Sequence, residues 1–250
     1  MDETLLNLLI DKNLALPGNR PLLLVILGPY AAAQAMLTLA AHLARAGPLQ
    51  VLDGGNRFNA YIVARQLRRL ITLDKARNSP DLRSCLDRIR VARAFTCYQM
   101  AALIDQACPG EARACPGNAR TAPNGSPTLV IDLLDTFYDE SAPLAERRRL
   151  AEHCMQRLRQ STLAPPVLRD PAPAQPGPVV VVSLRPPPPG KPDPTGLQEL
   201  VQAAADTVLI QYGSPAPGQK PHWHSQRGPW PGQDGPWPGQ EPQDRQPKLF

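Results

Sequence analysis

The residues closest to a recognisable chemical pattern follow an unbroken apolar run near the start of the chain. Leu22–Leu27 consists of six apolar residues, and the dipeptide Gly28-Pro29 and an Ala-rich segment come after it. A phosphate-binding loop has this place and shape, but it needs a second glycine, a lysine and a hydroxyl in the spacing G-x-x-x-x-G-K-[ST]. Counted from Gly28, those three positions hold Ala33, Gln34 and Ala35. The segment therefore predicts a degenerate nucleotide site.

A carboxylate at the end of a second strand-like segment could complete such a nucleotide site. Thr128–Ile131 precedes Asp132, which is the form of a strand whose terminal carboxylate holds magnesium through water. Without the lysine, however, the β- and γ-phosphates lose a point charge, and without a hydroxyl at position 35 the magnesium loses a protein ligand. Backbone N–H groups at the start of the helix could still attract an anion. ATP with Mg²⁺ is therefore disfavoured as a cofactor, and the remaining candidate nucleotide contacts are Gly28, Pro29, Gln34, Ala35 and Asp132.

No other catalytic or metal-binding set is visible in the sequence. Ser183 lies in no G-x-S-x-G elbow, and no histidine is placed to serve it. A G-x-G-x-x-G dinucleotide loop is also absent. The five cysteines form no C-x-x-C pair, which suits a reducing cytoplasm better than a disulfide framework. We expect no catalytic residue and no metal site.

Positive charge is concentrated in one segment. Residues 57–93 carry ten Lys and Arg against three Asp, a local charge of +7 in a chain whose total is +5. Such an excess could meet a polyanion, although a solvated helical face would show the same composition. Arg65, Arg68 and Arg69 have the spacing of one helical face and are candidates for phosphate contacts without sequence preference.

Strand-like segments alternate with helical ones over most of the chain. The expected strands are Leu22–Leu27, Gln50–Asp53, Ile89–Ala92, Thr128–Asp132, Pro178–Ser183 and Thr207–Tyr212. The expected helices between them are Ala32–Ala46, Arg57–Leu70, Thr96–Ala107, Pro143–Gln160 and Thr195–Ala205. This alternation predicts an α/β domain with an open, mostly parallel sheet and helices on both faces. Ligands of such sheets bind outside the carboxyl ends of the strands.

Proline marks the limits of this domain. Of the 31 prolines, 12 lie in residues 161–194 and 9 lie beyond residue 213. We expect an N-terminal helix and linker at 1–19, the domain at 20–213 with irregular loops at 107–127, 161–178 and 186–194, and a disordered Pro/Gly/Trp tail at 214–250. Trp230 and Trp237 lie in two Pro-Trp-Pro units of that tail and are candidates for binding a protein partner, unless the tail is a low-complexity segment without one.

The order of these segments resembles the cores of RecA/Rad51-type recombinases. The resemblance covers Leu22–Tyr212 and rests on the strand–loop–helix at Gly28, an acidic Gly turn, RVARAFTCYQMAALI, TLVID before a long helix, VVVVS and ADTVLIQY. In that family the turn after the second strand carries a glutamate that activates water, where this chain has Gly55. The fifth strand ends there in a polar phosphate sensor, where this chain has Ser183-Leu184-Arg185. In these departures the chain resembles the non-hydrolysing paralogues that assist recombinases, not the motor itself.

This resemblance implies a catalytically inactive protein that binds DNA, a recombinase partner or both in DNA recombination or repair. The loops that face DNA in a recombinase correspond to residues 135–143 and 185–194, and the second supplies Arg185 and Lys191 as candidate DNA contacts. Two alternatives stay open. One is an ATP-binding protein or weak ATPase that uses Asp132, and the other is a protein-assembly module with neither ligand.

The expected location is the cytoplasm, with association with the nucleoid as an option. Asp2 and Glu3 stand where a signal peptide would be basic. The longest apolar run, at residues 21–33, is interrupted by Gly28-Pro29 and is too short to span a bilayer. We therefore expect no membrane partner.

Overall fold

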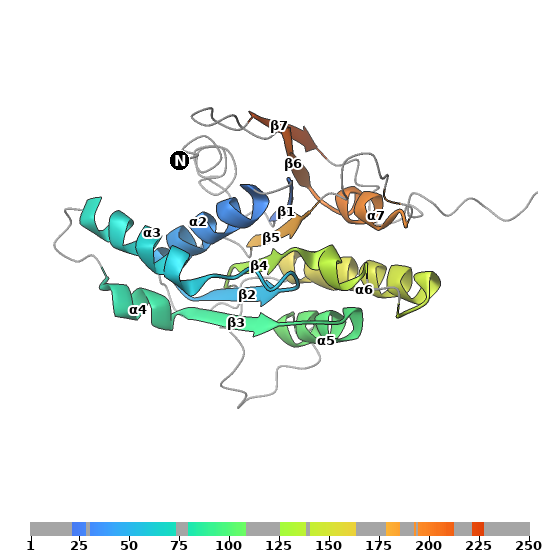
Figure 1. Cartoon of the computed structure of the whole chain (residues 1–250), viewed down its shortest axis with the longest axis horizontal. Coiled ribbons are helices and arrows are strands. Elements are labelled where there is room, and N and C mark those ends of the chain that lie inside the picture. Colours follow the sequence, from blue (N-terminus) through green and yellow to red (C-terminus); the bar gives the residue numbers. More distant parts are fainter. Residues whose placement is uncertain are drawn as a thin grey trace, which may run out of the picture.

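The computed structural model describes residues 22–28, 31–73, 80–108, 126–138, 141–163, 179–185, 193, 195–212 and 222–227. These residues form a seven-stranded sheet with the order β3-β2-β4-β5-β1-β6-β7 (Figure 1). Every neighbouring pair is parallel except the last, which is antiparallel. The strands are β1 (Leu22–Leu27), β2 (Leu49–Asp53), β3 (Ile89–Arg93), β4 (Thr128–Ile131), β5 (Val179–Leu184), β6 (Thr207–Tyr212) and β7 (His222–Arg227).

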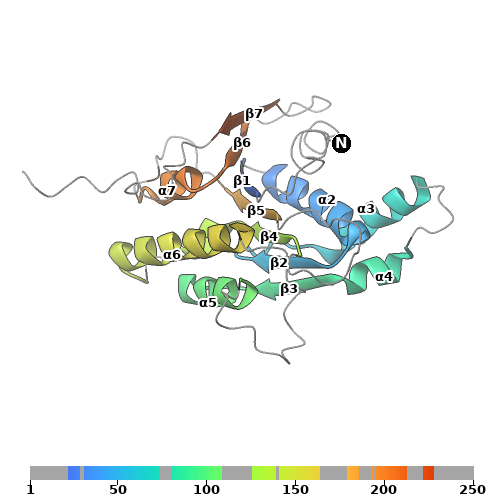
Figure 2. The ribbon, with the colours of Figure 1, turned by 180° about the vertical axis from the view of Figure 1, so that it is seen from behind.

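Helices cover both faces of the sheet, as the two opposite views in Figures 1 and 2 show. Residues of α2, α3 and α4 pack in one apolar cluster, and residues of α5, α6 and α7 pack in another. The expected open, mostly parallel α/β fold is therefore confirmed. The helices are α2 (Ala31–Ala46), α3 (Ala60–Leu73), α4 (Leu82–Asp87), α5 (Cys97–Ala107), α6 (Leu144–Leu163) and α7 (Leu197–Ala203), with a short 3-10 helix, η3 (Leu133–Thr136).

The interior strand β1 shows why an unbroken apolar run predicts a strand that is buried on both faces. Leu23, Val25 and Leu27 pack in the cluster of α5, α6 and α7. Leu24 and Ile26 pack in the cluster on the other face. A strand buried on both faces needs apolar residues at every position, because its side chains alternate between the faces.

Asp206 fixes the start of β6 against the start of β1. The backbone N–H of Leu23 donates to Oδ2 of Asp206 at 2.8 Å, and the Asp206 N–H donates to the Leu23 carbonyl at 2.9 Å. Arg159 of α6 forms an ion pair with the same carboxylate. The Ala-Asp-x-Val-Leu motif at Ala205–Leu209 therefore has a structural role, at the end of the sheet opposite the carboxyl ends of β1, β4 and β5.

Two elements differ from the expectation. α4 was not predicted, because it is only six residues long; Asp81 caps it by accepting a hydrogen bond from the Ser84 N–H at 3.0 Å. β7 lies beyond residue 213, in the part that we expected to be a disordered tail, and it pairs with the whole length of β6. Its sequence, HWHSQR, lacks the alternation of apolar and polar residues that marks a strand. Backbone hydrogen bonding along an otherwise open sheet edge explains the strand.

No helix within the described ranges is long and apolar enough to cross a membrane. The helix expected within residues 1–19 lies outside those ranges, as do most of the Pro-rich segments.

Candidate functional site

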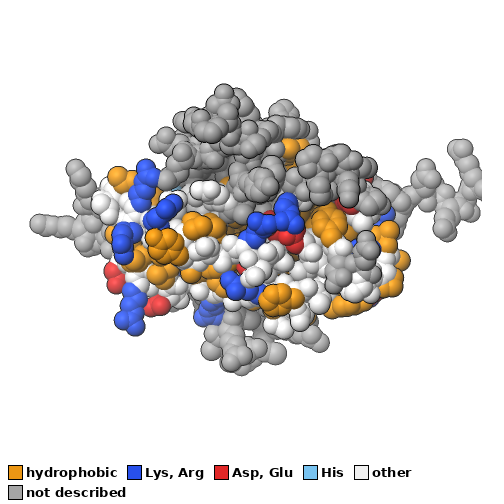
Figure 3. Space-filling model, viewed as in Figure 1, with side chains coloured by type: hydrophobic (Ala, Val, Ile, Leu, Met, Phe, Trp, Pro, Cys, Tyr) orange, Lys and Arg blue, Asp and Glu red, His pale blue; other side chains and the backbone are white. Residues whose placement is uncertain are grey.

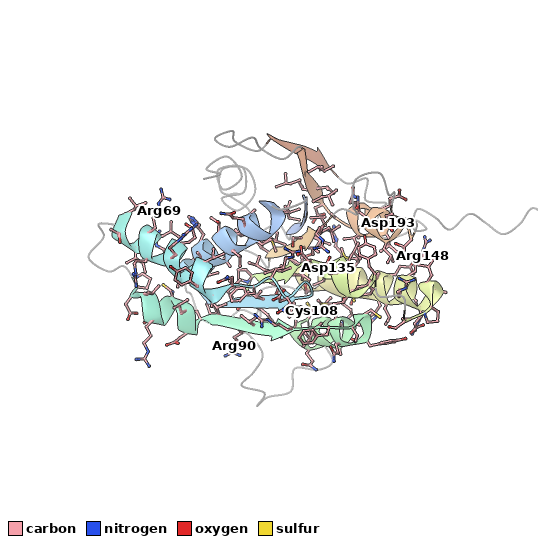
Figure 4. All side chains as sticks on the ribbon, in the orientation of Figure 1. Arg69, Arg90, Cys108, Asp135, Arg148 and Asp193 are labelled. Atoms are coloured by element: carbon pink, nitrogen blue, oxygen red, sulfur yellow. The ribbon has the colours of Figure 1, made fainter. Side chains whose placement is uncertain are left out.

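A cluster of charged side chains lies at the carboxyl ends of β2, β4 and β5. Asp53 is the last residue of β2, Asp132 follows β4, and Arg185 follows β5. Asp135, labelled in Figure 4, lies in η3 directly after Asp132. The parallel pairing of the three strands brings these residues to one edge of the sheet, where the expected site was placed.

Asp132 is almost completely buried and is engaged within the chain. Only 2% of its surface is exposed to solvent. The Ser183 hydroxyl donates to Oδ1 at 3.1 Å, and the Asp132 N–H donates to Oγ of Ser183 at 2.9 Å. Nε of Arg57 lies 3.2 Å from Oδ2, an ion pair without the alignment of a hydrogen bond. The cation beside this carboxylate is therefore a guanidinium of the same chain.

The backbone conformation of Asp132 ends strand β4. Asp132 was expected to close the strand, but it has φ 50° and ψ 55°, the left-handed conformation, and η3 begins after it. Aspartate visits that region more readily than most residues. Residues 133 and 134 then turn into the apolar core instead of forming an open loop.

Burial and charge oppose each other at the two neighbouring carboxyls. Burial raises the pKa of Asp132 and the Asp135 carboxyl raises it further, while the Ser183 hydroxyl and Arg57 act in the opposite direction. Burial also raises the pKa of Asp135, against the effect of Arg185 and Arg57. Nη2 of Arg185 lies 3.5 Å from Oδ2 of Asp135. The site thus holds carboxyls that are harder to ionise than usual beside guanidinium groups.

Two glycines let the turn after β2 approach Asp132. The Gly54 N–H donates to the Ile131 carbonyl at 2.8 Å. A Cβ atom at Gly54 would lie 2.8 Å from the Asp132 carbonyl oxygen and from Cε of Met100. At Gly55, a Cβ atom would lie 2.8 Å from Oδ2 of Asp132. Real Cβ contacts are essentially never this short, so the turn has no room for the glutamate that the resemblance associates with position 55.

Asp53 organises the segment that carries Arg57. Its fully buried carboxylate accepts hydrogen bonds from the Arg57 and Phe58 N–H groups, each at 2.9 Å. Nε of Arg93 lies 3.3 Å from Oδ2, and Nη2 of Arg93 donates to the Phe58 carbonyl at 3.2 Å. These bonds hold residues 57–58 outside the helix. Asn59 accepts the first helical N–H bonds, so α3 begins at Ala60 and not at Arg57 as expected.

Sequence reasoning did not identify Asp53, Arg57 and Arg93 as parts of one site. It counted the two arginines only within the basic segment. One signal was present, since a carboxylate at the end of a buried strand before two glycines is unusual for a surface turn. The sequence alone does not show which arginines fold back onto that carboxylate.

Among the described residues expected at a degenerate nucleotide loop, namely Gly28, Gln34 and Ala35, none has a charged side chain or a hydroxyl. Gly28 is buried, and its N–H donates to the Leu184 carbonyl at 3.3 Å. Gln34 is exposed on α2, whereas Ala35 packs against the apolar cluster of α2, α3 and α4. Pro29 lies outside the described residues. Among the residues that the structure does describe, no three His, Cys, Asp or Glu side chains are grouped to hold a metal ion.

The structure separates the candidate DNA contacts. Arg65, Arg68 and Arg69 are exposed on α3, and Figure 4 shows Arg69 near the end of that helix, away from Asp135. Arg185 instead belongs to the charged cluster at the carboxyl ends of the strands. The remaining candidates, Lys191, Trp230 and Trp237, lie outside the described residues.

Comparisons with known proteins gave matches only among solved structures. No protein-family model matches the sequence, and no curated protein matches it. The chain is similar to the crystal structure of the RadB recombinase, with 13% identity and a TM-score of 0.47 over 79% of this chain and 78% of that chain. It is also similar to a second solved structure, an ATPase domain, with 12% identity and a TM-score of 0.40 over 78% of this chain and 71% of that chain. The fold class itself follows from the strand order and pairing described above.

Proposed function

We propose that this protein is a RecA-like protein without ATPase activity, which acts in DNA recombination or repair by binding DNA, a recombinase partner or both. One observation carries this proposal. Asp132, the acidic residue that remains at the degenerate nucleotide site, is buried, bonded to Ser183 and paired with Arg57. A magnesium ion at this carboxylate would have to compete with a guanidinium that is already in place.

The other groups that ATP hydrolysis needs are not found at this site either. A phosphoryl transfer site needs charge on the phosphates, a metal and a residue that orients the attacking water. Position 34 is an exposed glutamine, position 35 is a partly buried alanine that packs against an apolar cluster, and a side chain at Gly55 would collide with Asp132. These features favour a scaffold over an ATPase at this end of the sheet.

A nucleotide titration tests this part of the proposal. The full chain is titrated with a fluorescent ATP analogue in the presence of Mg²⁺, and release of inorganic phosphate from ATP is measured in parallel. We expect no saturable binding at micromolar concentrations and no hydrolysis. Saturable binding that the Asp132→Ala substitution abolishes would overturn it in favour of a nucleotide-dependent protein.

The DNA part rests on the exposed basic face of α3. Arginines that contact phosphates bind without sequence preference, and their binding weakens steeply with salt because counterions are released. We expect a labelled oligonucleotide to bind at low salt and to dissociate at high salt, as measured by fluorescence anisotropy. Absence of binding at low salt would remove DNA from the proposal and leave a protein partner.

A protein partner could bind the tail at residues 214–250. Two Pro-Trp-Pro units on one chain could engage a partner at two points, which strengthens binding without new types of contact. A recombinase captured by the full chain, and lost with Trp230→Ala and Trp237→Ala together, would support this role. If the substitutions leave capture of the recombinase unchanged, the partner binds the domain at 20–213 and not the tail.

A further inference from the structure

One face of α3 is basic along its whole length. Tyr61, Arg65, Arg68 and Thr72 are all exposed, and their spacing of three and four residues places them on one side of the helix. Residues 60–73 include no Asp or Glu. Within the described ranges, neither Arg65 nor Arg68 forms an ion pair or a side-chain hydrogen bond. Figure 3 shows Lys and Arg side chains gathered over the part of the molecule that holds α3 and α4. The helix itself therefore supplies no counter-charge to this face.

Exposed apolar surface borders these arginines. Tyr61 is 74% exposed in the first turn of α3, and Leu73 is 70% exposed as its last residue. A guanidinium interacts favourably with the face of an aromatic ring, and most strongly with that of tryptophan. A ligand that carries both tryptophan and carboxylate groups would therefore match this face better than one that carries charge alone.

The chain contains such a segment after its last described residue. Residues 228–244 read GPWPGQDGPWPGQEPQD and contain two tryptophans, three acidic residues and no Lys or Arg. In each of the two repeats an acidic residue follows the tryptophan by four positions. The segment has a charge of −3, and α3 has a charge of +3. The two are therefore complementary both in charge and in the presence of aromatic rings.

The segment leaves the domain at the end of the sheet toward which α3 runs. Arg227, the last residue of β7, pairs with Thr207, the first residue of β6. The segment therefore starts where the parallel strands begin. α3 runs toward the same end, because β3 begins there after α4 and is parallel to β2. In the strand order β7 lies five places from β2, which is about 24 Å at the usual strand spacing.

The number of residues after Arg227 decides which repeat can reach α3. A proline-rich segment favours the polyproline II conformation, which rises about 3.1 Å per residue. Trp230 follows Arg227 by three residues, so it stays within about 9 Å of the end of β7. Trp237 follows by ten residues and reaches about 31 Å. The second repeat can therefore reach α3, and the first cannot.

We infer that the second Pro-Trp-Pro unit docks on α3 of the same chain and competes there with DNA. The Trp237 ring packs on an arginine side chain, and Glu241 and Asp244 pair with the arginines. This inference rests on the proposed DNA-binding function and adds its regulation. Exposed ring–guanidinium and ion-pair contacts are each weak, but the short connection to β7 keeps the segment at a high effective concentration. DNA can displace it, and a partner that captures the tail would free α3 for DNA.

Tryptophan fluorescence tests the docking in the absence of DNA. The chain has three tryptophans, so the full chain with Trp223→Phe and Trp230→Phe keeps Trp237 alone. We expect Trp237 to be protected from quenching by acrylamide. The protection should be lost when Arg65→Ala and Arg68→Ala are added, and equally when Glu241→Gln and Asp244→Asn are added.

The matched control keeps Trp230 alone, through Trp223→Phe and Trp237→Phe. Its quenching should be the same with and without the two arginine substitutions. Quenching of Trp237 that does not respond to the arginine substitutions would overturn the docking on α3, whether the ring is protected or not. Protection that appears only when a protein partner is added would overturn it as well.

Fluorescence anisotropy with a labelled duplex oligonucleotide tests the competition. Trp237→Ala leaves the charge unchanged and should raise the affinity for DNA about twofold to fivefold, which is the size of an exposed cation–π contact. Trp230→Ala is the matched control and should leave the affinity unchanged. In a chain with Arg65→Ala and Arg68→Ala, Trp237→Ala should no longer raise it, because the tail has lost its docking face.

The two readouts separate this inference from the proposed function. An unchanged affinity for DNA in Trp237→Ala would overturn the competition, while DNA binding by the chain would stand. If neither the unaltered chain nor Trp237→Ala binds DNA at low salt, the DNA-binding proposal fails and the competition fails with it. The quenching of Trp237 then still decides whether the tail docks on α3.

Discussion

A Cβ atom added at Gly55 would lie 2.8 Å from both Oδ2 and Cβ of Asp132. The absence of a side chain at position 55 and the buried setting of Asp132 are therefore parts of one arrangement. The turn after β2 approaches Asp132 closely because it carries no side chain there, and this approach brings Arg57 to the carboxylate. We therefore expect that a single substitution at either position does not produce a hydrolytic site.

Gly55→Glu is expected to lower stability without producing ATPase activity. Overpacking of a well-packed site costs about 1–3 kcal/mol, and the added side chain meets the Asp132 carboxylate directly. Urea unfolding measures the first effect and phosphate release the second. Gly47→Ala is the control, because a Cβ atom at Gly47 meets nothing within 4 Å. A Gly55→Glu protein that is as stable as this control would contradict the packing described here.

Arg57→Ala is expected to destabilise the fold by about 1–3 kcal/mol, since it leaves a buried carboxylate without its cation. Asp132→Asn should reduce that loss when the two are combined, so a double-mutant cycle should give a favourable coupling energy. The exposed pair Arg83–Asp87, whose charged atoms are 4.0 Å apart, supplies a matched cycle with a coupling near zero. Additive effects at Arg57 and Asp132 would show that the pair contributes nothing.

The raised pKa of Asp132 predicts a pH dependence of stability with a definite sign. Between the ordinary pKa of about 4 and the raised value, the folded state holds a proton that the unfolded chain has released. The free energy of unfolding therefore falls as the pH rises through this window. Relative to Asp132→Asn, the unaltered protein should lose stability from about pH 4 upward and level off above the raised pKa.

Urea unfolding of both proteins at a series of pH values measures this difference. Asp87→Asn provides a carboxylate control on the surface of α4, because the Asp87 side chain is 75% exposed. If the free energy of unfolding of the unaltered protein instead rises with pH relative to that of Asp132→Asn, Arg57 and Ser183 outweigh burial.

Asp206→Ala is expected to destabilise the fold by about 2–4 kcal/mol, because it removes the acceptor of the Leu23 N–H and the ion pair with Arg159. DNA binding should not change beyond the loss of folded protein, since Asp206 lies at the opposite end of the sheet from the charged cluster. Asp81→Ala, which removes the exposed cap of α4, should destabilise the fold clearly less. Equal effects of the two substitutions in urea unfolding would argue against a special role of Asp206.

Replacing Arg65, Arg68 and Arg69 together by alanine should weaken DNA binding and flatten its salt dependence. Each lost phosphate contact reduces the slope of log affinity against log salt by about 0.9 on duplex DNA, so the slope should fall by roughly 3 if all three make contact. Anisotropy titrations at several salt concentrations give this slope. Arg83→Ala, on α4, is the single-charge control. An unchanged slope in the triple variant would exclude α3 as the DNA face.

The sequence predicted the features that depend on local pattern. The apolar run at Leu22–Leu27 predicted an interior strand, and the carboxylate after Thr128–Ile131 was placed correctly at the carboxyl edge. The contact between Arg57 and Asp132 was not predictable, because it depends on how closely one turn approaches another strand. The hydroxyl of Ser183, on a third strand, donates a hydrogen bond to the same carboxylate. This contact could not be predicted either, because no sequence spacing indicates it. β7 was not predicted, because it pairs with β6 through backbone hydrogen bonds, and these do not require particular residue types.

The position of β7 has a consequence for synthesis of the chain. Among the described strands it is the last to leave the ribosome, yet it covers the side of β6 that no other described strand pairs. Until residue 227 has emerged, a nascent chain that has already assembled β1 to β6 presents bare N–H and C=O groups along that side. Slow elongation through the proline-rich stretch at 213–221 would prolong this exposure. The protein should therefore depend on chaperones more during translation than its finished fold would suggest.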